Sequence, residues 1–473
     1  MTKEFSSHRG HGKTATQTAT QSVVQSAAQD DENKCEISTI GETVRRASFY
    51  HGLMPRHDIE PLLKKDGDFL LRKTEVNGAT VLALAVRWNG PVKHFMVNQS
   101  DKDSYYFETH HEKSVIDLVE WHMKTKTPVS TTSGAKLLKP IDRPPWILNH
   151  DSIKTIKKLG EGAFGEVYMA ELTTDKVSIP VAVKTMREEV SRDSRLKFMK
   201  EARIMRKFHH QHVVQILGIA VHEHPLMLVM ELCLGGSVLS YMRKHKGKTT
   251  LETKLRFVLE ASSGLAYLEE KSCIHRDIAA RNCLLTEKHA VKISDFGMSD
   301  ERKTLTDERL DKVPVKWLAP ETMQNKIYSS KTDVWSFGVM AYEIYSDGGE
   351  PYPTLTNIQT RAKIIVQNYR MEMPKDVPPA VVTLVSECWA KEPENRPPFS
   401  KIHERLLSEY KKEHGDPKDR EKDKDKDKKE DKDRDKKEDK EKDKDDEKKE
   451  KRESKKDEVK DSLTKKEKKE RKK

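Results

Sequence analysis

The 473-residue sequence lacks several features that mark common protein classes. Its five cysteines are scattered, odd in number and not in CxxC spacing, which argues against a disulfide framework or a zinc site and for a reducing compartment. No apolar run approaches the roughly 18 residues of a membrane span. The N-terminal "MTKEFSSHRG" has neither the apolar core of a signal peptide nor the Met-Gly start of a myristoylation signal. We therefore expect a cytoplasmic chain without a membrane span, while peripheral membrane recruitment stays open.

An excess of charge of one sign is also lacking, although the formal net charge is +11. Residues 416–473 hold 28 Lys/Arg and 24 Asp/Glu, so that the first 415 residues keep 61 of the 89 basic and 54 of the 78 acidic residues. A nucleic-acid surface needs concentrated basic charge, and we expect no nucleic acid as a partner. The final "KKEKKERKK" could serve nuclear import or bind acidic surfaces, but a charge run is more often a solvated tail.

Changes of composition divide the chain into five segments. Residues 1–46 are rich in Gln, Thr and Ser and nearly free of aromatic residues, which predicts disorder, with a short helix over 21–29 as an alternative. A first domain over 47–140 and a second domain over 152–412 are joined by a linker over 141–151, which is proline-rich and hence stiff. The Lys/Asp/Glu-rich tail over 413–473 is expected to be disordered.

The two domains differ in their predicted elements. In the first, apolar alternation predicts strands over 68–75, 80–88 and 93–99, between helical patterns over 56–65 and 114–125. In the second, strand signals come first and helical spacing follows, most clearly over 257–271 and 333–346. The fold class is therefore α+β in both domains.

Phosphate chemistry is indicated by "KLGEGAFGEVY", which contains Gly160, Gly162 and Gly165. A GxGxxG pattern alone is weak evidence, since glycines also mark ordinary turns. The following "VAVK" places Lys184 on a strand, and "FMKEARIM" supplies Glu201 on a helix. Alone, either residue would be read as an ordinary charged surface residue. Together, the glutamate can position the lysine so that it holds the α- and β-phosphates of a nucleotide.

The segment "CIHRDIAARNCLL" and the "DFG" at Asp295 complete the pattern. Asp277 would accept the proton of a substrate hydroxyl, and Asn282 and Asp295 would bind two magnesium ions. These motifs, in this order and spacing, resemble the eukaryotic protein kinase fold, a strand-rich small lobe followed by a helix-rich large lobe. The resemblance implies ATP and Mg²⁺, or Mn²⁺ in its place, as cofactors.

The same resemblance assigns further positions. It makes Met230 the gatekeeper and Leu284 the apolar floor, and it pairs Glu321 with Arg396 as a buried ion pair. Ala279 stands where serine/threonine kinases have a lysine, whereas Arg281 and the "PVKW" of 314–317 are similar to tyrosine kinases. The implied nucleotide-binding residues are Leu159, Gly160, Glu161, Gly162, Ala163, Phe164, Gly165, Glu166, Val167, Ala182, Lys184, Met230, Glu231, Cys233 and Leu284.

The first domain resembles the SH2 domain through "FYHGLMPR", "GDFLLRKTE" and "KHF". Arg72 lies inside an apolar strand, where a guanidinium is costly unless an anion or a structural partner meets it. A phosphotyrosine offers about two negative charges and oxygens for a bidentate contact. By motif, Arg56 and His94 line the ring and phosphate, and Thr74 donates a hydroxyl.

An SH2 domain joined to a tyrosine kinase through "WILNH" is similar to the Fes/Fer family of non-receptor kinases. That family's N-terminal membrane-curving domain does not fit in 46 residues, so its lipid binding is not expected here. The implied partners are tyrosine-containing substrates and phosphotyrosine proteins, and we expect a monomer.

The segment from Asp295 to Glu321 contains no tyrosine, although an activation loop of this family carries its switch tyrosine there. The family's "GMSR", whose arginine binds the phosphate, reads "GMSD" with Asp300. We hypothesise that Asp307 or Glu308 pairs with Arg276 in place of the phosphate, or that SH2 docking alone orders the loop. Phosphorylation of Thr304 or Thr306 by another kinase is the rival explanation.

Two other functions compete with a tyrosine kinase. An SH2 adaptor with a scaffolding kinase domain would explain the missing switch, but Lys184, Asp277, Asn282 and Asp295 are intact. A serine/threonine kinase is disfavoured by Ala279 and "PVKW". The histidines of "HHQHVV" lack a carboxylate or cysteine to complete a metal site, and we do not expect a metal there.

Overall fold

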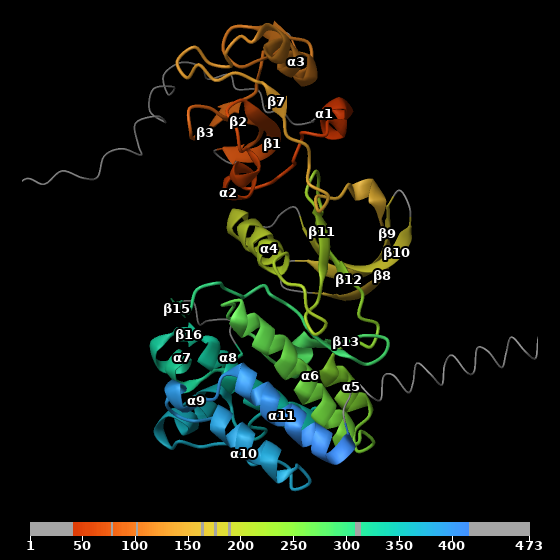
Figure 1. Ribbon diagram of the computed structural model, residues 1–473, viewed down its shortest axis with the longest axis vertical. Coiled ribbons are helices and arrows are strands. Elements are labelled where there is room, and N and C mark those ends of the chain that lie inside the picture. The colour runs from red at the N-terminus through yellow and green to blue at the C-terminus, as the bar shows by residue number, and fades with distance from the viewer. Residues whose placement is uncertain are drawn as a thin grey trace, which may run out of the picture. The chain divides into compact units, whose positions relative to one another are not determined.

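The computed structural model describes residues 41–76, 79–100, 103–161, 165–174, 177–187, 191–307 and 314–415, and these form two compact units (Figure 1). The first unit consists of the chain up to Ile179, with Val183–Met199 and Gly218–Val229. The second consists of Pro180–Ala182, Lys200–Leu217 and the chain from Met230 on. The expected disorder of 1–46 and 413–473 falls mostly outside the described residues, as do the alternative helix over 21–29 and the residues Gly162, Ala163, Phe164 and Glu308. At its inner ends this prediction is wrong, because 42–46 form a short helix with Val44 buried and the last helix continues to His414.

The N-terminal part of the first unit is built on a sheet of order β3-β2-β1-β7. Its strands are β1 (Asp68–Val76), β2 (Ala79–Arg87), β3 (Val92–Met96) and β7 (Lys139–Pro140), and only β7 runs parallel to its neighbour. A second small sheet joins β4 (Asn98–Gln99), β5 (Tyr105–Tyr106) and β6 (His111–Glu112). The three predicted strands are therefore confirmed, the last one divided between β3 and β4.

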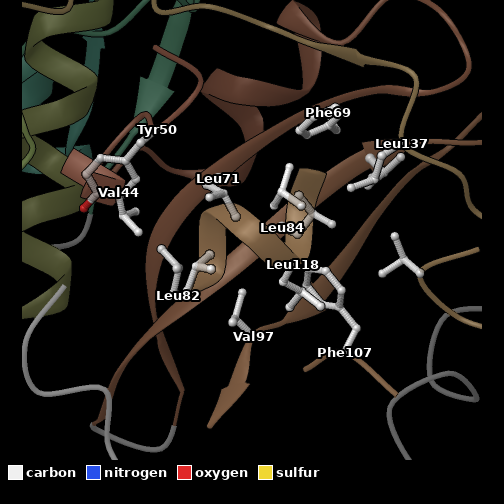
Figure 2. Close-up of a cluster of buried hydrophobic side chains, with 14 of the residues drawn as sticks. Val44, Tyr50, Phe69, Leu71, Leu82, Leu84, Val97, Phe107, Leu118 and Leu137 are labelled. Atoms are coloured by element: carbon white, nitrogen blue, oxygen red, sulfur yellow. The ribbon is translucent and has the colours of Figure 1, made fainter. Parts of the chain in front are cut away.

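Helix α3 (Val115–Thr125) covers the core side of this sheet, and a short α1 (Glu42–Arg46) lies near the chain's first described residues. Ser114 caps α3 by accepting a hydrogen bond from the Asp117 amide, as serine commonly does at this position. Alternation along β1 and β2 sends Phe69, Leu71 and Leu84 toward Leu118 (Figure 2). Arg72, the next residue of β1, therefore points to the opposite face.

The helix predicted over 56–65 is shorter than its apolar spacing suggests. Helix α2 covers Arg56–Ile59 and is followed by one 3₁₀ turn, η1 (Glu60–Leu62). Pro61 has no amide hydrogen to continue the helical ladder, and Leu63 is extended. The pattern identified the right face, but proline ended the helix early.

The linker is bonded along its length within the first unit. The Arg143 guanidinium donates to the carbonyls of Arg45, Ala47 and Tyr50, at 3.0–3.3 Å. The Leu148 amide donates to the carbonyl of Ile219, at 2.7 Å. These contacts make the proline-rich segment a packed element of the unit.

A five-stranded sheet of order β11-β12-β10-β9-β8 follows the linker. Its strands are β8 (Ile153–Glu161), β9 (Glu166–Thr173), β10 (Ser178–Met186), β11 (Ile216–Ala220) and β12 (Leu226–Glu231), with η2 (His150–Ser152) before them and α4 (Arg192–Met205) after β10. Strands β8 and β9 form the hairpin that contains the glycine motif.

The second unit is mainly helical and is organised around α8 (Ser330–Tyr345), in which 13 of 16 residues are buried. Helix α6 (Leu251–Glu270) lies beside α11 (Phe399–His414). The remaining elements are α5 (Val238–Lys244), η3 (Ala280–Asn282), β13 (Cys283–Leu285), β14 (Val291–Ile293), β15 (Thr304–Thr306), η4 (Val315–Trp317), α7 (Pro320–Asn325), β16 (Ile327–Ser329), α9 (Asn357–Val366), α10 (Pro379–Cys388) and η5 (Pro393–Asn395). The helices predicted over 257–271 and 333–346 are confirmed as parts of α6 and α8.

Candidate active site and anion pocket

The carboxylate of Asp277 is bonded at both oxygens by two residues predicted to act with it. The Asn282 side-chain amide donates to Asp277 Oδ2 and to its backbone carbonyl, at 2.7 Å each. The Arg281 guanidinium donates to Oδ1. Because Arg281 also lies over the Trp317 ring, 4.7 Å from its centroid, the carboxylate has a fixed orientation.

Two buried carboxylates of helix α8 accept hydrogen bonds from the backbone of the catalytic segment, residues 275–280. Asp333 accepts hydrogen bonds from the amides of His275 and Arg276, at 2.7 and 2.8 Å. Burial raises the pKa of Asp333 to about 7, although both amide bonds oppose the shift. Glu343 Oε2 accepts from the Ala280 amide and the Trp317 indole, at 2.9 and 3.0 Å.

His275 is fully buried beside the catalytic segment, and burial lowers its pKa. Its Nε2 lies 3.0 Å from the carbonyl of Ser294, and its Nδ1 accepts from the Asp277 amide at 3.3 Å. This arrangement requires a neutral ring with the proton on Nε2.

Asp295 and Glu201 meet at the same turn within the second unit. A Cβ placed on Gly297 would lie 3.3 Å from Asp295 Oδ1 and 3.5 Å from Glu201 Oε2, so both carboxylates border this glycine. Asp295 has a left-handed backbone, with φ of 63°. Such a conformation is strained for a residue with a side chain and persists where its surroundings determine it.

The glycine motif shows two different needs for glycine. A Cβ on Gly165 would lie 1.8 Å from the carbonyl oxygen of Thr185 on β10, so this close approach to β10 requires glycine. A Cβ on Gly160 would meet nothing within 4 Å, which leaves open space over that backbone. Leu159 is half exposed, and Val167 pairs with Gly160 across the hairpin.

The acidic residues of the hairpin form ion pairs with a lysine and an arginine. Lys158 Nζ lies 3.1 Å from Glu161 and 2.5 Å from Glu166, and Arg187 lies 3.0 Å from Glu161. On β10, Ala182 and Lys184 share the half-buried face, while Val183 between them is buried on the other.

The predicted hinge begins at the end of β12, in the second unit. Met230 and Glu231 are the last two residues of this strand, and both are half-buried. Glu231 accepts from the Gln215 amide at 2.6 Å and pairs with Lys292 at 2.8 Å. The carboxylate is therefore held by a backbone donor and a cation at once.

Burial also characterises two further residues of the predicted nucleotide set, Cys233 and Leu284. It raises the pKa of the Cys233 thiol to about 11, which keeps the thiol neutral. Leu284 is half-buried on β13, and its backbone forms a bridge with Ser237, the N-cap of α5. This bridge joins the predicted apolar floor to the segment that continues from the hinge.

Arg72 is a buried cation whose donors are incompletely used. Its side chain donates to the Met54 and Lys73 carbonyls at 3.2 and 3.4 Å, and its Nε has no partner among the described residues. Burial, together with the neighbouring Arg56, lowers the pKa of Arg72 to about 10. A buried guanidinium with unfilled donors fits an anionic ligand better than the structural ion pair considered as its alternative.

His94 and Glu60 lie near Arg72. His94 Nε2 is 3.5 Å from Glu60 Oε1, and burial followed by Arg56 and Arg72 lowers the pKa of His94 to about 4. Thr74 lies two residues beyond Arg72 on β1 and therefore on the same face. The four predicted phosphotyrosine-binding residues thus come from α2, β1 and β3, and Glu60 is an acidic neighbour that the motif did not indicate.

Comparison with known proteins identifies two domains. A model described as protein tyrosine and serine/threonine kinase matches residues 153–406, and an SH2 domain model matches residues 49–122. Fer-related kinase 1 of Caenorhabditis elegans is 55% identical over 378 residues, covering 79% of this chain and 96% of that protein. The chain belongs to the Fer-like protein-tyrosine kinases. Its enzyme class is that of ATP-dependent protein-tyrosine kinases, a family that generally uses Mg²⁺ as the divalent metal.

Other Fer-like kinases match over the same region. Tyrosine-protein kinase Fer of Mus musculus is 39% identical over 376 residues, covering 79% of this chain and 45% of that protein. The tyrosine-protein kinase transforming protein Fps of avian sarcoma virus (strain PRCII) is 36% identical over 375 residues, covering 79% of this chain and 69% of that protein. The chain therefore spans nearly all of the nematode relative and less than half of mouse Fer.

The loop of this Fer-like kinase contains two acidic residues with basic partners. Arg276 Nη2 donates to Asp307 Oδ2 at 2.8 Å, which confirms the expected pair. Arg276 is nearly buried, lies 4.1 Å from the centroid of the Tyr328 ring and donates to the Met298 carbonyl. Asp300 instead accepts from Lys200 of α4, at 2.6 Å. Thr304 and Thr306 are exposed on β15.

The predicted ion pair of the large lobe is also confirmed. Arg396 donates to Glu321 through two nitrogens, at 2.6 and 2.8 Å, and its side chain is fully buried. The histidines set aside as a metal site have other contacts: His212 Nδ1 lies 2.9 Å from the Val291 carbonyl oxygen, and His210 stacks on Tyr267.

Sequence reasoning missed Glu343, although a signal existed. It is an acidic residue within the otherwise apolar "DVWSFGVMAYEIYS", where an unpaired carboxylate would be costly. In the described ranges, none of the helices combines the length and apolar character that crossing a bilayer demands.

Proposed function

We propose that Asp277 accepts the proton of a substrate tyrosine hydroxyl while the γ-phosphoryl group of ATP is transferred to it. The observation that carries this role is the carboxylate itself, bonded by Arg281 and Asn282 at opposite oxygens. A carboxylate aimed in this way can orient the attacking hydroxyl, which is the main task of the protein in phosphoryl transfer. We assign Arg281 to the phenol of the substrate by its similarity to tyrosine kinases, and its contact with the Trp317 ring supports a fixed position.

We assign nucleotide and metal binding by motif, and the donor set suits both. By motif, Lys184 with Glu201 as its acidic partner would contact the α- and β-phosphates, and Asn282 and Asp295 would supply the amide and carboxylate oxygens that Mg²⁺ prefers. Both hydrogens of the Asn282 amide point to Asp277, so its oxygen faces away and is available as a ligand. When bound, Mg²⁺ offsets the charge of the β- and γ-phosphoryl oxygens. The remaining nucleotide-binding residues are those predicted from the motifs, with Met230 as gatekeeper and Glu231 to Cys233 as hinge.

The SH2 domain binds phosphotyrosine through Arg72, Arg56, His94 and Thr74. The unpartnered Nε of buried Arg72 supports this assignment, because an arriving phosphate supplies the missing acceptor. We place the SH2 domain at 47–140, the linker at 141–151 and the kinase domain at 152–412. The kinase acts as a cytoplasmic monomer, a location that suits the four free cysteines among the described residues.

Control of this kinase does not require a phosphorylated tyrosine in the loop. Asp307 takes part of the role of the phosphate by neutralising Arg276, which precedes the catalytic Asp277. A single carboxylate carries one charge where a phosphate carries about two, so the substitute is weaker. The contacts of the SH2 domain with the small lobe, among them the Glu75–Arg195 ion pair, are a second means of support.

The test is phosphorylation of tyrosine and serine peptides by the purified, phosphatase-treated chain with Mg²⁺ and ATP, beside an Asp277→Asn variant. We expect immediate transfer to tyrosine alone, and none by the variant. Activity only after incubation with another kinase would point to Thr304 or Thr306 as the switch. No activity in either condition, with phosphopeptide binding intact, would favour an SH2 adaptor.

A further inference from the structure

We propose that Asp300 and Lys200 form a positioning pair that holds Glu201 in its active place by a fixed charge instead of a phosphate. The inference rests on the proposed function, in which Glu201 positions Lys184. It assigns a role to an acidic residue that stands where the family carries a phosphate-binding arginine. The change from arginine to Asp300 therefore removes a phosphate-binding residue and supplies an ion-pair partner for Lys200.

Asp300 is fixed to the catalytic segment by its backbone. Its amide donates to the Ile274 carbonyl at 2.9 Å, and its carbonyl accepts from the Ile274 amide at 2.8 Å. Ile274 is followed directly by His275, Arg276 and Asp277. The residue therefore cannot move without moving the start of the catalytic segment.

The side chain of Asp300 reaches in the other direction, to α4. Its Oδ2 accepts from Lys200 Nζ at 2.6 Å, and its two oxygens accept from Arg302 at 2.7 and 2.9 Å. The carboxylate is 7% exposed, and its bonds with Arg302 and Lys200 hold its pKa well below the usual range. It thus remains charged at any physiological pH.

Lys200 precedes Glu201 on α4, so a contact that fixes one residue restricts the other. Glu201 is buried and borders Gly297, the last residue of the "DFG" turn. Asp300 comes three residues after Gly297, so the segment that borders Glu201 is also joined to α4 by the Lys200–Asp300 ion pair. A loop that lacks its phosphate still has a charged link to the helix that carries Glu201.

Removing Lys200 does not leave Asp300 without partners, because Arg302 remains. Lys200 is itself 42% exposed, so solvent screens much of its attraction. We therefore expect the fold to survive the loss of the pair while the position of α4 becomes less defined. This separates a positioning role from a purely structural one.

A neighbouring ion pair provides a matched control. Lys207 lies just beyond α4 and pairs with Glu301, the residue after Asp300, at 2.7 Å. Its two side chains are 53% and 36% exposed, so both pairs join the same two segments but only one is partly buried. Unlike Lys200, Lys207 is not a sequence neighbour of Glu201.

The experiment compares Lys200→Met, Asp300→Asn and their double variant with Lys207→Met and Glu301→Gln in the full chain. We expect kcat/KM for ATP to fall about tenfold in each member of the first set, with a non-additive double variant, and less than about twofold in the second. Lys200→Arg should restore activity. Hydrogen exchange of the α4 amides should accelerate only in the first set, and phosphopeptide binding should stay unchanged in all.

Equal effects in the two sets, additive losses, or unchanged α4 exchange would overturn the proposal. A wild-type chain that phosphorylates no tyrosine would instead overturn the proposed function, and α4 exchange would still report whether the pair holds the helix. The two failures are therefore distinguishable.

Discussion

At the residue scale, the predictable positions are those whose chemistry allows few alternatives. Asp277, Arg281 and Asn282 are identified by the resemblance of their segment to the protein kinase motif, and the structure brings them together at one carboxylate. Glu60 and Glu343 were not predicted because their partners come from elements that only tertiary packing brings near. A buried charge can be suspected from sequence, but its partner cannot be named.

Arg72→Met should separate binding from stability. Phosphotyrosine-peptide affinity should fall at least about a hundredfold, because charge-assisted hydrogen bonds of about 1.5–3 kcal/mol each are lost. The melting temperature should not fall, since the change removes a buried cation with an unpartnered Nε. Calorimetric titration and thermal denaturation measure the two effects.

The matched control for this variant is Arg87→Met on the next strand. Arg87 donates to the Leu63 carbonyl at 2.5 Å, so its loss should lower the melting temperature and spare peptide binding. If Arg72→Met destabilised the domain as much as Arg87→Met does, the Arg72 side chain would be structural.

Arg396→Met should lower the free energy of unfolding of the second unit by about 3–5 kcal/mol, because it leaves the Glu321 carboxylate without its buried partner. Urea denaturation at constant slope measures the change. Arg405→Met, which breaks the half-exposed pair with Glu387, should cost less than about 1 kcal/mol. If both variants lowered the free energy of unfolding by similar amounts, burial would not determine how much the Arg396–Glu321 pair contributes to stability.

At the scale of elements, strands and long helices were predictable from apolar periodicity, and their ends were not. The pattern over 56–65 continues past Pro61, where the helical ladder cannot. In the loop, the resemblance to the family led us to expect Asp307 or Glu308 as the partner of Arg276, and the structure pairs Arg276 with Asp307. The resemblance did not predict Lys200 as the partner of Asp300, since that contact depends on where α4 lies.

Asp307→Ala should lower kcat about tenfold without added phosphate, because Arg276, only 7% exposed, loses its carboxylate. Steady-state kinetics of phosphatase-treated enzyme measure this, and Asp307→Glu should recover part of the activity. Thr304→Ala and Thr306→Ala, on the adjoining strand β15, are the controls and should leave the rate unchanged. Loss of activity in the threonine variants, with phosphate found there by mass spectrometry, would support the rival switch.

At the scale of the whole molecule, the sequence indicated two domains and a linker, whereas the first compact unit combines the SH2 domain with most of the small-lobe sheet. The sequence motifs do not indicate which residues join them. Leu53 donates its amide to the Val221 carbonyl at 2.8 Å, and Arg45 pairs with Glu223 at 2.7 Å. Such contacts depend on surface shape, which local periodicity does not report.

Acid should weaken this unit between pH 6.5 and 4. Burial lowers the pKa of both His51 and His222 from 6.5 to about 4, with Arg143 adding to each shift. Below pH 6.5 the unfolded chain therefore binds more protons than the folded one, and stability falls as pH decreases. Thermal denaturation from pH 7.5 to 5 would measure the slope.

The double variant His51→Gln, His222→Gln should flatten that profile, and His57→Gln, with a half-exposed ring, should not. A profile that stays equally steep in the double variant would assign the acid sensitivity to other groups.

Gly52 has a left-handed backbone, with φ of 63°, and a Cβ there would lie 2.2 Å from the Val221 carbonyl oxygen. Domain shuffling is usually pictured as the exchange of independent modules, but this contact makes the SH2 module conditional on the lobe that it meets. A foreign SH2 domain grafted at this boundary would have to bring a residue without a side chain at the equivalent of Gly52. The two domains are therefore exchanged most easily together. A chimaera without glycine at this position would lose the close packing between its SH2 domain and the small lobe.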